Sequence, residues 1–448
     1  MKRIMSRHAN YSENSPEKFF LFSVMLFGII SMFLTLPLTN GDEGYHLSRS
    51  YTIFSKDMPK SMQPDALRQF EMINTSQDPL HNGFDLNDFF KTRLSDVEND
   101  SFKINIQKEN NITAKIDLGH LPSAIGVLIG RYIYPSYGIM LLFARFTNLI
   151  FFATCLFFII KFSNGGKWSL VMMFSVPFLQ KIASPSYDVF AYVSLAVFGV
   201  NVLKLAKFNR FKELSTRDIL FSLVTIIMIL FSKSNYVFAL PLLLFLPMIT
   251  NPLKQLYIDQ NRRVKLFFWL LMSILFVMFI VLMNSKFGLI NFTKQFFNSY
   301  INVATMGRRG ESLFNVVSTI LPDFLNIFWI LCLFFVMLTE KSYKWDNIFI
   351  IGNVSVFLLN WVGIFAAFYL SLGRPTHPLD ELSGRYLHPF IICFLPLAQL
   401  VNYKYKLTTS EKAVKWIAII STLSIMFFYL LICYYRGYII HVTPTWKT

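Results

Sequence analysis

The sequence predicts an all-α polytopic membrane protein with about eleven transmembrane helices. Hydrophobic residues make up 54% of the 448 positions and charged residues only 15%, whereas soluble domains carry about 25% charged residues. The mean hydropathy is +0.47. Apolar runs also recur along the whole chain, and most of them approach the length that crosses a hydrocarbon core of about 30 Å.

The first apolar run covers residues 19–38 and follows a basic N-terminal segment. No small-residue cleavage site comes after it, so we expect a retained helix rather than a signal peptide. Some of the later runs are short, and their polar interruptions must lie against protein or a water-filled cavity. The ten further predicted spans are 136–160, 168–183, 187–206, 218–232, 235–250, 266–283, 312–338, 347–372, 386–401 and 414–435.

The distribution of Lys and Arg predicts the orientation. With residues 1–18 as a cytoplasmic tail, the cytoplasmic segments contain 21 of the 42 basic residues, against ten in the short outer loops and the C-terminal tail. This bias is the positive-inside pattern. It explains most of the formal net charge of +16 and removes nucleic acid as an expected partner. Eleven spans then place residues 436–448 outside, after a multi-helix domain at 136–435.

The segment 39–135 is the one sizeable aqueous part, a large first extracytoplasmic loop. Residues 39–119 hold nine basic and thirteen acidic residues and few clustered apolar ones. We therefore expect short interfacial helices on the membrane face rather than an independent core. Residues 119–134 are apolar but short and contain Arg131, which predicts an interfacial or re-entrant helix before the next span.

Charged residues near membrane depth gather on the outer face. A charge at a helix centre costs about 2.5–3.5 kcal/mol on insertion scales, so each such residue needs a reason. Carboxylates and cations that converge on the outer leaflet are typical of a site for a lipid-linked anionic substrate. The candidates are Asp42, Glu43, His46, Asp188, Lys233, Arg308, Arg309, Arg374, Arg385 and Tyr386, with Arg145 inside the second span.

Each candidate also has a purely structural interpretation. Asp42 and Glu43 could begin a solvated loop, although the flanking Gly41 and Gly44 favour a shaped turn. His46 could be an interfacial histidine, and Lys233 could extend to the lipid headgroups. Arg308 and Arg309 could be headgroup contacts. For Arg145 we expect a structural partner such as Asp188 or a lipid phosphate.

Several motifs carry a family resemblance. Asp42-Glu43-x-x-His46 after the first helix resembles bacterial membrane proteins of domain-of-unknown-function family 2142. The resemblance spans roughly residues 19–400, but Gly41 and Tyr45 replace the Pro and the small residue that are common in the family. Further motifs follow in the family's order: Leu121-Pro-Ser-Ala-Ile-Gly126, Ala144-Arg-Phe-Thr-Asn148, Ser186-Tyr-Asp188, Ser232-Lys233 and Gly384-Arg-Tyr386.

The resemblance implies the fold and chemistry of a GT-C glycosyltransferase, which uses polyprenyl-phosphate sugars at the outer face of the bacterial plasma membrane. An acceptor hydroxyl needs a carboxylate base, and the resemblance makes Asp42 the first choice. Glu43 would hold the acceptor, share the base role or, with Asp42, bind a divalent cation such as Mg or Mn. Arg385 suits the departing phosphate best, followed by Lys233 and then Arg308 and Arg309. The supporting residues would be His46, Arg145, Asp188, Tyr386 and Arg374.

The implied reaction inverts the anomeric configuration, since no nucleophile for a retaining route can be placed. The acceptor would be a cell-surface glycan, such as an O-antigen, a wall polymer or an S-layer glycan, and the partners would be proteins that make or flip the lipid-linked sugar. Two other classes stay open. A flippase or transporter of lipid-linked saccharides would also use intramembrane charges, although we find no internal repeat in the sequence. A non-catalytic partner in polysaccharide assembly would keep the fold without the reaction.

Overall fold

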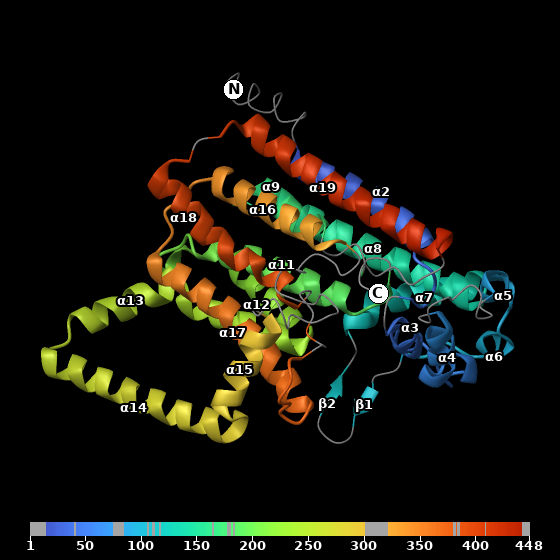
Figure 1. Ribbon diagram of the computed structural model, residues 1–448, viewed down its shortest axis with the longest axis horizontal. Coiled ribbons are helices and arrows are strands. Elements are labelled where there is room, and N and C mark those ends of the chain that lie inside the picture. Colours follow the sequence, from blue (N-terminus) through green and yellow to red (C-terminus); the bar gives the residue numbers. More distant parts are fainter. Residues whose placement is uncertain are drawn as a thin grey trace.

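The computed structural model is a bundle of long helices with a layer of short helices at one end (Figure 1). It describes residues 15–300 and 321–440, except for gaps at 40–41, 75–84, 105–106, 110–112, 116–117, 164, 177–180, 182–183, 380–381, 383–385 and 408.

Six described helices are long and apolar enough to cross a membrane. A seventh candidate is a broken span, in which the 3₁₀ helix η4 (Ser234–Phe245) meets α13 (Pro247–Ile258) at a bend of 55°. The protein is therefore a helical membrane protein. The six helices are α2 (Pro16–Leu34), α8 (Tyr137–Phe162), α11 (Asp188–Leu205), α14 (Arg262–Phe287), α17 (Asn347–Ser371) and α19 (Glu411–Tyr434, extended by the π-helical turn Tyr435–Ile439).

The expected count of eleven spans is not confirmed. Helices form at every predicted run, but four of them are short: α9 (Lys167–Ser175), α12 (Thr216–Leu230), α16 (Asp323–Thr339) and the pair η6 (His388–Phe394) and α18 (Leu395–Tyr405). The 15 residues of α12 rise about 22 Å at 1.5 Å per residue, which is less than a bilayer core. Apolar composition predicted where these helices lie but not where each one ends.

The segment between α2 and α8 folds into short helices, as expected, and also contains two strands. The antiparallel strands β1 (Gln107–Glu109) and β2 (Thr113–Lys115) pair with Lys108 opposite Ala114, a short hairpin in an otherwise helical protein. The helices are α3 (Glu43–Thr52), η1 (Lys60–Met62), α4 (Pro64–Asn74), α5 (Leu86–Lys91), α6 (Ser95–Glu98), η2 (Leu118–His120) and α7 (Leu121–Ile133).

These short helices share a small apolar core with the bundle. Leu47 of α3 and Leu67 of α4 are buried in one cluster with Val127 of α7 and Met140 of α8. α7 lies directly against α8, because a Cβ on Gly126 would be 2.2 Å from the carbonyl oxygen of Phe143. The layer is therefore not an independent domain, and its position is fixed by α7 and α8.

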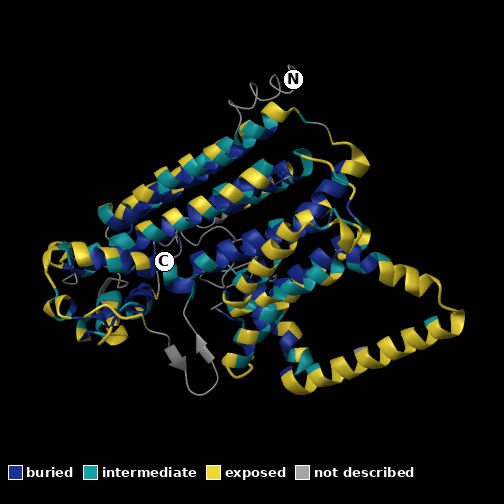
Figure 2. Cartoon of the chain, turned by 180° about the vertical axis from the view of Figure 1, so that it is seen from behind, coloured by how far each residue is buried: buried dark blue, intermediate teal, exposed yellow. Residues whose placement is uncertain are grey.

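Helix α14 differs from the other long helices because its apolar side chains are exposed along its length (Figure 2). A helix that is apolar on all sides is typical of a membrane span surrounded by lipid. It joins the bundle through α15 (Leu289–Tyr300), whose Gln295 side chain donates to the carbonyl of Thr376 at 2.7 Å.

Candidate functional site

Asp42 occupies the turn between α2 and α3 with an unusual backbone conformation. Its φ of 58° and ψ of 14° lie in the left-handed region, which costs a non-glycine residue about 1–3 kcal/mol. Its carbonyl accepts the His46 amide at 2.9 Å, while its side chain is exposed and makes no capping bond. The helix start thus holds a carboxylate outward in a strained turn.

The flanking Gly41 and Gly44 led us to expect a shaped turn here. Asp42 itself takes the left-handed conformation. Gly44 serves a different purpose, because a Cβ there would lie 3.2 Å from the backbone of Leu67, so it lets α3 and α4 approach each other closely. Gly41 lies outside the described residues.

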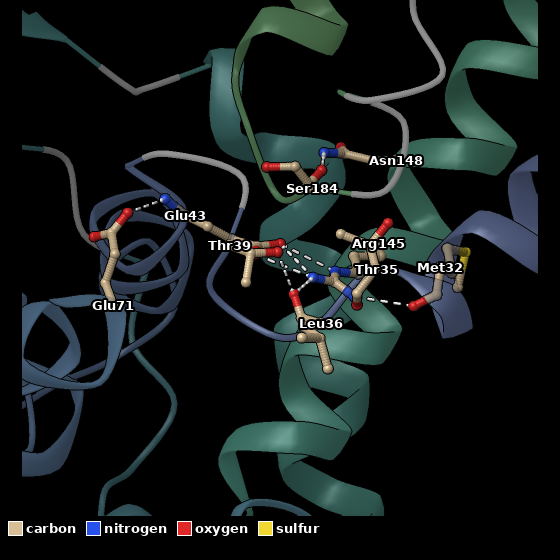
Figure 3. Close-up of polar contacts among 9 residues, drawn as sticks. All are labelled: Met32, Thr35, Leu36, Thr39, Glu43, Glu71, Arg145, Asn148 and Ser184. Carbon is tan, nitrogen blue, oxygen red and sulfur yellow. Dashed lines mark hydrogen bonds and ion pairs between the residues drawn. The ribbon is translucent and has the colours of Figure 1, made fainter. Parts of the chain in front are cut away.

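Glu43 is completely buried and forms a two-pronged ion pair with Arg145 (Figure 3). Arg145 Nε lies 3.0 Å from Glu43 Oε1, and Arg145 Nη2 lies 3.0 Å from Oε2. Arg145 also donates to the carbonyls of Met32 at 2.9 Å, Thr35 at 3.0 Å and Leu36 at 3.4 Å. These bonds tie the end of α2 and the start of α3 to α8.

The partner of Arg145 is therefore Glu43, and the expectation of Asp188 or a lipid phosphate was wrong. Burial raises the pKa of Glu43, and the Arg145 guanidinium opposes that rise. Because both carboxylate oxygens accept from Arg145, Glu43 and Asp42 do not fit a shared divalent cation. In the described part of the chain, no three His, Cys, Asp or Glu side chains are arranged to hold a metal ion.

Glu71 is a third carboxylate at this turn, and the sequence analysis missed it. Its Oε1 accepts the backbone amide of Glu43 at 3.1 Å. Burial and the charge of Asp42 raise the pKa of Glu71. Nothing in the sequence distinguishes Glu71 from the other acidic residues of the loop, because only the packing of α4 on α3 brings it here.

His46 lies one turn after Asp42 and is buried among polar groups. Its Nδ1 lies 2.8 Å from His120 Nε2, and its Nε2 lies 3.3 Å from Ser186 Oγ. The ring of Tyr187 packs edge-on against both histidines. Burial, followed by His120, lowers the pKa of His46 to about 3. His46 is therefore neutral and links α3 to the segment before α11.

Lys233 and Asp188 form an ion pair on another side of the cluster. Lys233 Nζ lies 2.8 Å from Asp188 Oδ1 and 4.4 Å from the ring centre of Tyr386. Since its side chain is only 15% exposed, Lys233 does not extend to the headgroups. Asn148 of α8 positions the segment before Asp188 by donating to the carbonyl of Ser184 at 2.9 Å. The residues just before η4 and η6 thus meet the first residue of α11.

Lys181 is a further cation that the sequence analysis did not single out. It is buried, and its charge lowers the pKa of both Glu43 and His46. A lysine inside the apolar run 168–183 was the signal that could have found it, because such charges are rare without a function.

The remaining arginines are not brought to this cluster by any described contact. Arg308, Arg309 and Arg385 lie outside the described residues, so their predicted contacts with a phosphate stay predictions. Arg374 follows α17 with a φ of 61° and an exposed side chain. Its backbone amide donates to Tyr369 at 2.9 Å.

A family model described as "Predicted membrane protein (DUF2142)" matches residues 25–308. The matched segment contains both sides of the cluster from Asp42 to Lys233 and ends before Tyr386. No curated protein and no solved structure matches the chain.

Proposed function

The chain belongs to the DUF2142 family of predicted membrane proteins, and we propose that it is an inverting glycosyltransferase of the GT-C type. The proposed reaction moves a sugar from a polyprenyl phosphate to a cell-surface glycan at the outer face of a bacterial plasma membrane. The observation that carries the proposal is the exposed Asp42 carboxylate. A strained turn holds it beside a buried polar cluster that contains Lys233.

In the proposed reaction, an acceptor hydroxyl oxygen attacks the anomeric carbon of the donor sugar. The bond from this carbon to the lipid phosphate breaks as the new bond forms, and Asp42 takes the hydroxyl proton. The electron pair of the broken bond leaves on the polyprenyl phosphate. Lys233 stabilises the charge that develops there. A single displacement inverts the anomeric configuration.

Glu43 acts as a positioning residue in this proposal, not as a second base. Its carboxylate already accepts two bonds from Arg145, so it is poorly placed to accept a proton from an acceptor. Its role is to fix the first turn of α3, and Asp42 directly precedes that turn. His46, held by His120 and Ser186, fixes the same helix one turn later.

The proposed orientation places the cluster outside and the N-terminus in the cytoplasm. The layer of α3 to α6 lies at one end of the bundle, and the connection between α18 and α19 lies at the other (Figure 1). Lys341, Lys406, Lys412 and Lys415 line a cleft at that second end. Basic residues at the end opposite the cluster are those expected of a cytoplasmic face.

The test compares Asp42→Asn with Asp65→Asn, which changes an exposed carboxylate of α4 in the same layer. Purified variants are given labelled short-chain polyprenyl-phosphate sugars and a glycan acceptor. We expect Asp42→Asn to lose about 10²- to 10⁴-fold in turnover, as is typical for removal of a general base, while donor binding and melting temperature stay unchanged. Equal turnover of the two variants would contradict the role of Asp42.

A further inference from the structure

A second cavity lies far from the carboxylate cluster, near the opposite end of α8. It has a volume of about 320 Å³ and lies between α8, α11, α12 and α18. Its wall is mainly apolar, with contributions from Phe158, Phe162 and Phe221. These three side chains are also exposed on the outside of the bundle. The cavity therefore adjoins the surface that faces lipid.

Two buried amides line this cavity, and each has one polar atom without a hydrogen-bond partner among the described residues. These atoms are Gln399 Nε2 and Asn201 Oδ1. Gln399 is 1% exposed and Asn201 is 3% exposed. A buried polar group without a partner is unfavourable, and native structures contain few of them. Both atoms lie in the wall of the cavity and are enclosed by protein.

The neighbouring hydrogen bonds fix which atom of each amide is available. Gln399 Oε1 accepts from the Trp345 indole at 2.9 Å, and an indole N–H can only donate, so the Gln399 amino group is left over. Asn201 Nδ2 donates to Ser222 Oγ at 3.1 Å. Since the Ser222 hydroxyl itself donates to the Asp218 carbonyl, the Asn201 carbonyl oxygen is left over. The cavity wall thus contains one donor and one acceptor without a partner among the described residues.

Cations stand beside the same cavity. Lys204 and Lys207 both line it. Lys204 pairs with Asp218, but no carboxylate of the described residues lies within ion-pairing distance of Lys207, which sits over the Tyr343 ring at 5.3 Å. Burial and the nearby Lys341 lower the pKa of Lys207. A negative group placed here would offset the repulsion between Lys207 and Lys341.

We propose that this cavity binds an anionic phospholipid of the phosphatidylglycerol type, with an acyl chain in the apolar part and the phosphate at Lys207. Because Gln399 Nε2 and Asn201 Oδ1 are enclosed in the cavity wall, they reach the ester carbonyls and the glycerol hydroxyls of such a lipid only when their side chains turn toward the cavity. The bilayer around the protein supplies this ligand directly. The site is independent of the proposed glycosyl transfer.

The test measures lipid retained by purified protein, using native mass spectrometry and equal amounts of phosphatidylglycerol and phosphatidylcholine with the same acyl chains. We expect wild type to prefer phosphatidylglycerol about fivefold, which corresponds to one lysine near an anionic lipid. Lys207→Gln should remove the preference. Lys212→Gln, an exposed lysine of the nearby 3₁₀ turn Phe211–Glu213, should keep it.

A second variant tests the acyl-chain part of the cavity. Val200→Phe fills the space from α11 and should reduce the retention of both lipids. If this variant folds poorly, Lys207→Gln still tests the proposal independently. Three results would overturn the proposal: equal preference in Lys207→Gln and Lys212→Gln, displacement of phosphatidylglycerol by glycerol phosphate without chains, or its displacement by a short-chain polyprenyl phosphate. The second result would indicate an anion site and the third a donor site.

Discussion

Replacing Glu43 by Gln should destabilise the folded protein by about 3–5 kcal/mol, because it leaves a buried charge without its partner. The side chain of Arg145 is 3% exposed and that of Glu43 is 0% exposed, so solvent cannot replace the lost charge. The carbonyls of Met32, Thr35 and Leu36 still accept from Arg145. These bonds place the expected loss toward the lower end of the range.

A double-mutant cycle with Arg145→Met measures how much of this loss in stability comes from the interaction between Glu43 and Arg145. The double variant leaves neither charge buried, so its loss in stability should be smaller than the sum of the two single losses. We expect a coupling energy of at least about 1 kcal/mol, since contacting residues typically show 0.5–3 kcal/mol. The assay is denaturant unfolding in detergent micelles, from which the free energy of unfolding is obtained.

The matched control is Glu17→Gln, which removes a weaker ion pair at the other end of the bundle. Glu17 Oε2 lies 3.6 Å from Lys167 Nζ, and the lysine side chain is 33% exposed. The Glu17 side chain is 13% exposed, but the long distance and the partly exposed lysine bring the expected contribution into the range of surface pairs, about 0–1 kcal/mol. The reasoning is refuted if Glu43→Gln costs no more than Glu17→Gln, or if the Glu43 and Arg145 losses simply add.

Three other predictions follow from the same geometry. His46 has a pKa of about 3 against an ordinary value of 6.5, so the unfolded chain takes up the proton first. Neutral His46 therefore contributes fully to the free energy of unfolding above pH 6.5, and this contribution is lost as the pH falls toward 3. At pH 5 the loss is about 2 kcal/mol, and unfolding of His46→Gln should lack this part of the pH dependence. Gly126→Ala should lower the free energy of unfolding by about 1–3 kcal/mol through overpacking, because the new Cβ would lie 2.2 Å from a carbonyl oxygen of α8. The control is Gly165→Ala, where the nearest atom to a new Cβ lies at 4.0 Å, and it should leave the melting temperature unchanged. Lys233→Gln should lower kcat/KM for sugar transfer by about 10²- to 10³-fold, the range for losing one group that stabilises developing charge, and activity equal to wild type would exclude Lys233 from phosphate stabilisation.

The position of the polar cluster could be predicted from the sequence. Asp42, His46, Asp188 and Lys233 each lie near the end of an apolar run, and threading these runs through a bilayer brings such ends to one face. The structure joins them through His46–Ser186 and Lys233–Asp188 contacts. The positions of the apolar runs and of the polar residues at their ends were sufficient for this prediction, because a spanning helix runs from one membrane face to the other.

The pairings inside the cluster could not be predicted. Arg145 was expected to meet Asp188 or a lipid phosphate, but the turn after α2 brings Glu43 into its reach. Glu71 and His120 were missed because their positions depend on the packing of α4 and η2 against α3, which leaves no periodic signal. The expected number of spans is likewise not confirmed among the described residues, since hydropathy does not report where a helix such as α12 stops.

The most direct measurement is sugar transfer by the purified wild-type protein from a panel of short-chain polyprenyl-phosphate sugars, with the anomeric configuration of the product determined by NMR. The account predicts a glycan product of inverted configuration that Asp42→Asn does not form. A retained configuration would contradict the single displacement. Movement of the lipid-linked sugar across vesicle membranes without any transfer would contradict the enzyme itself and favour a flippase.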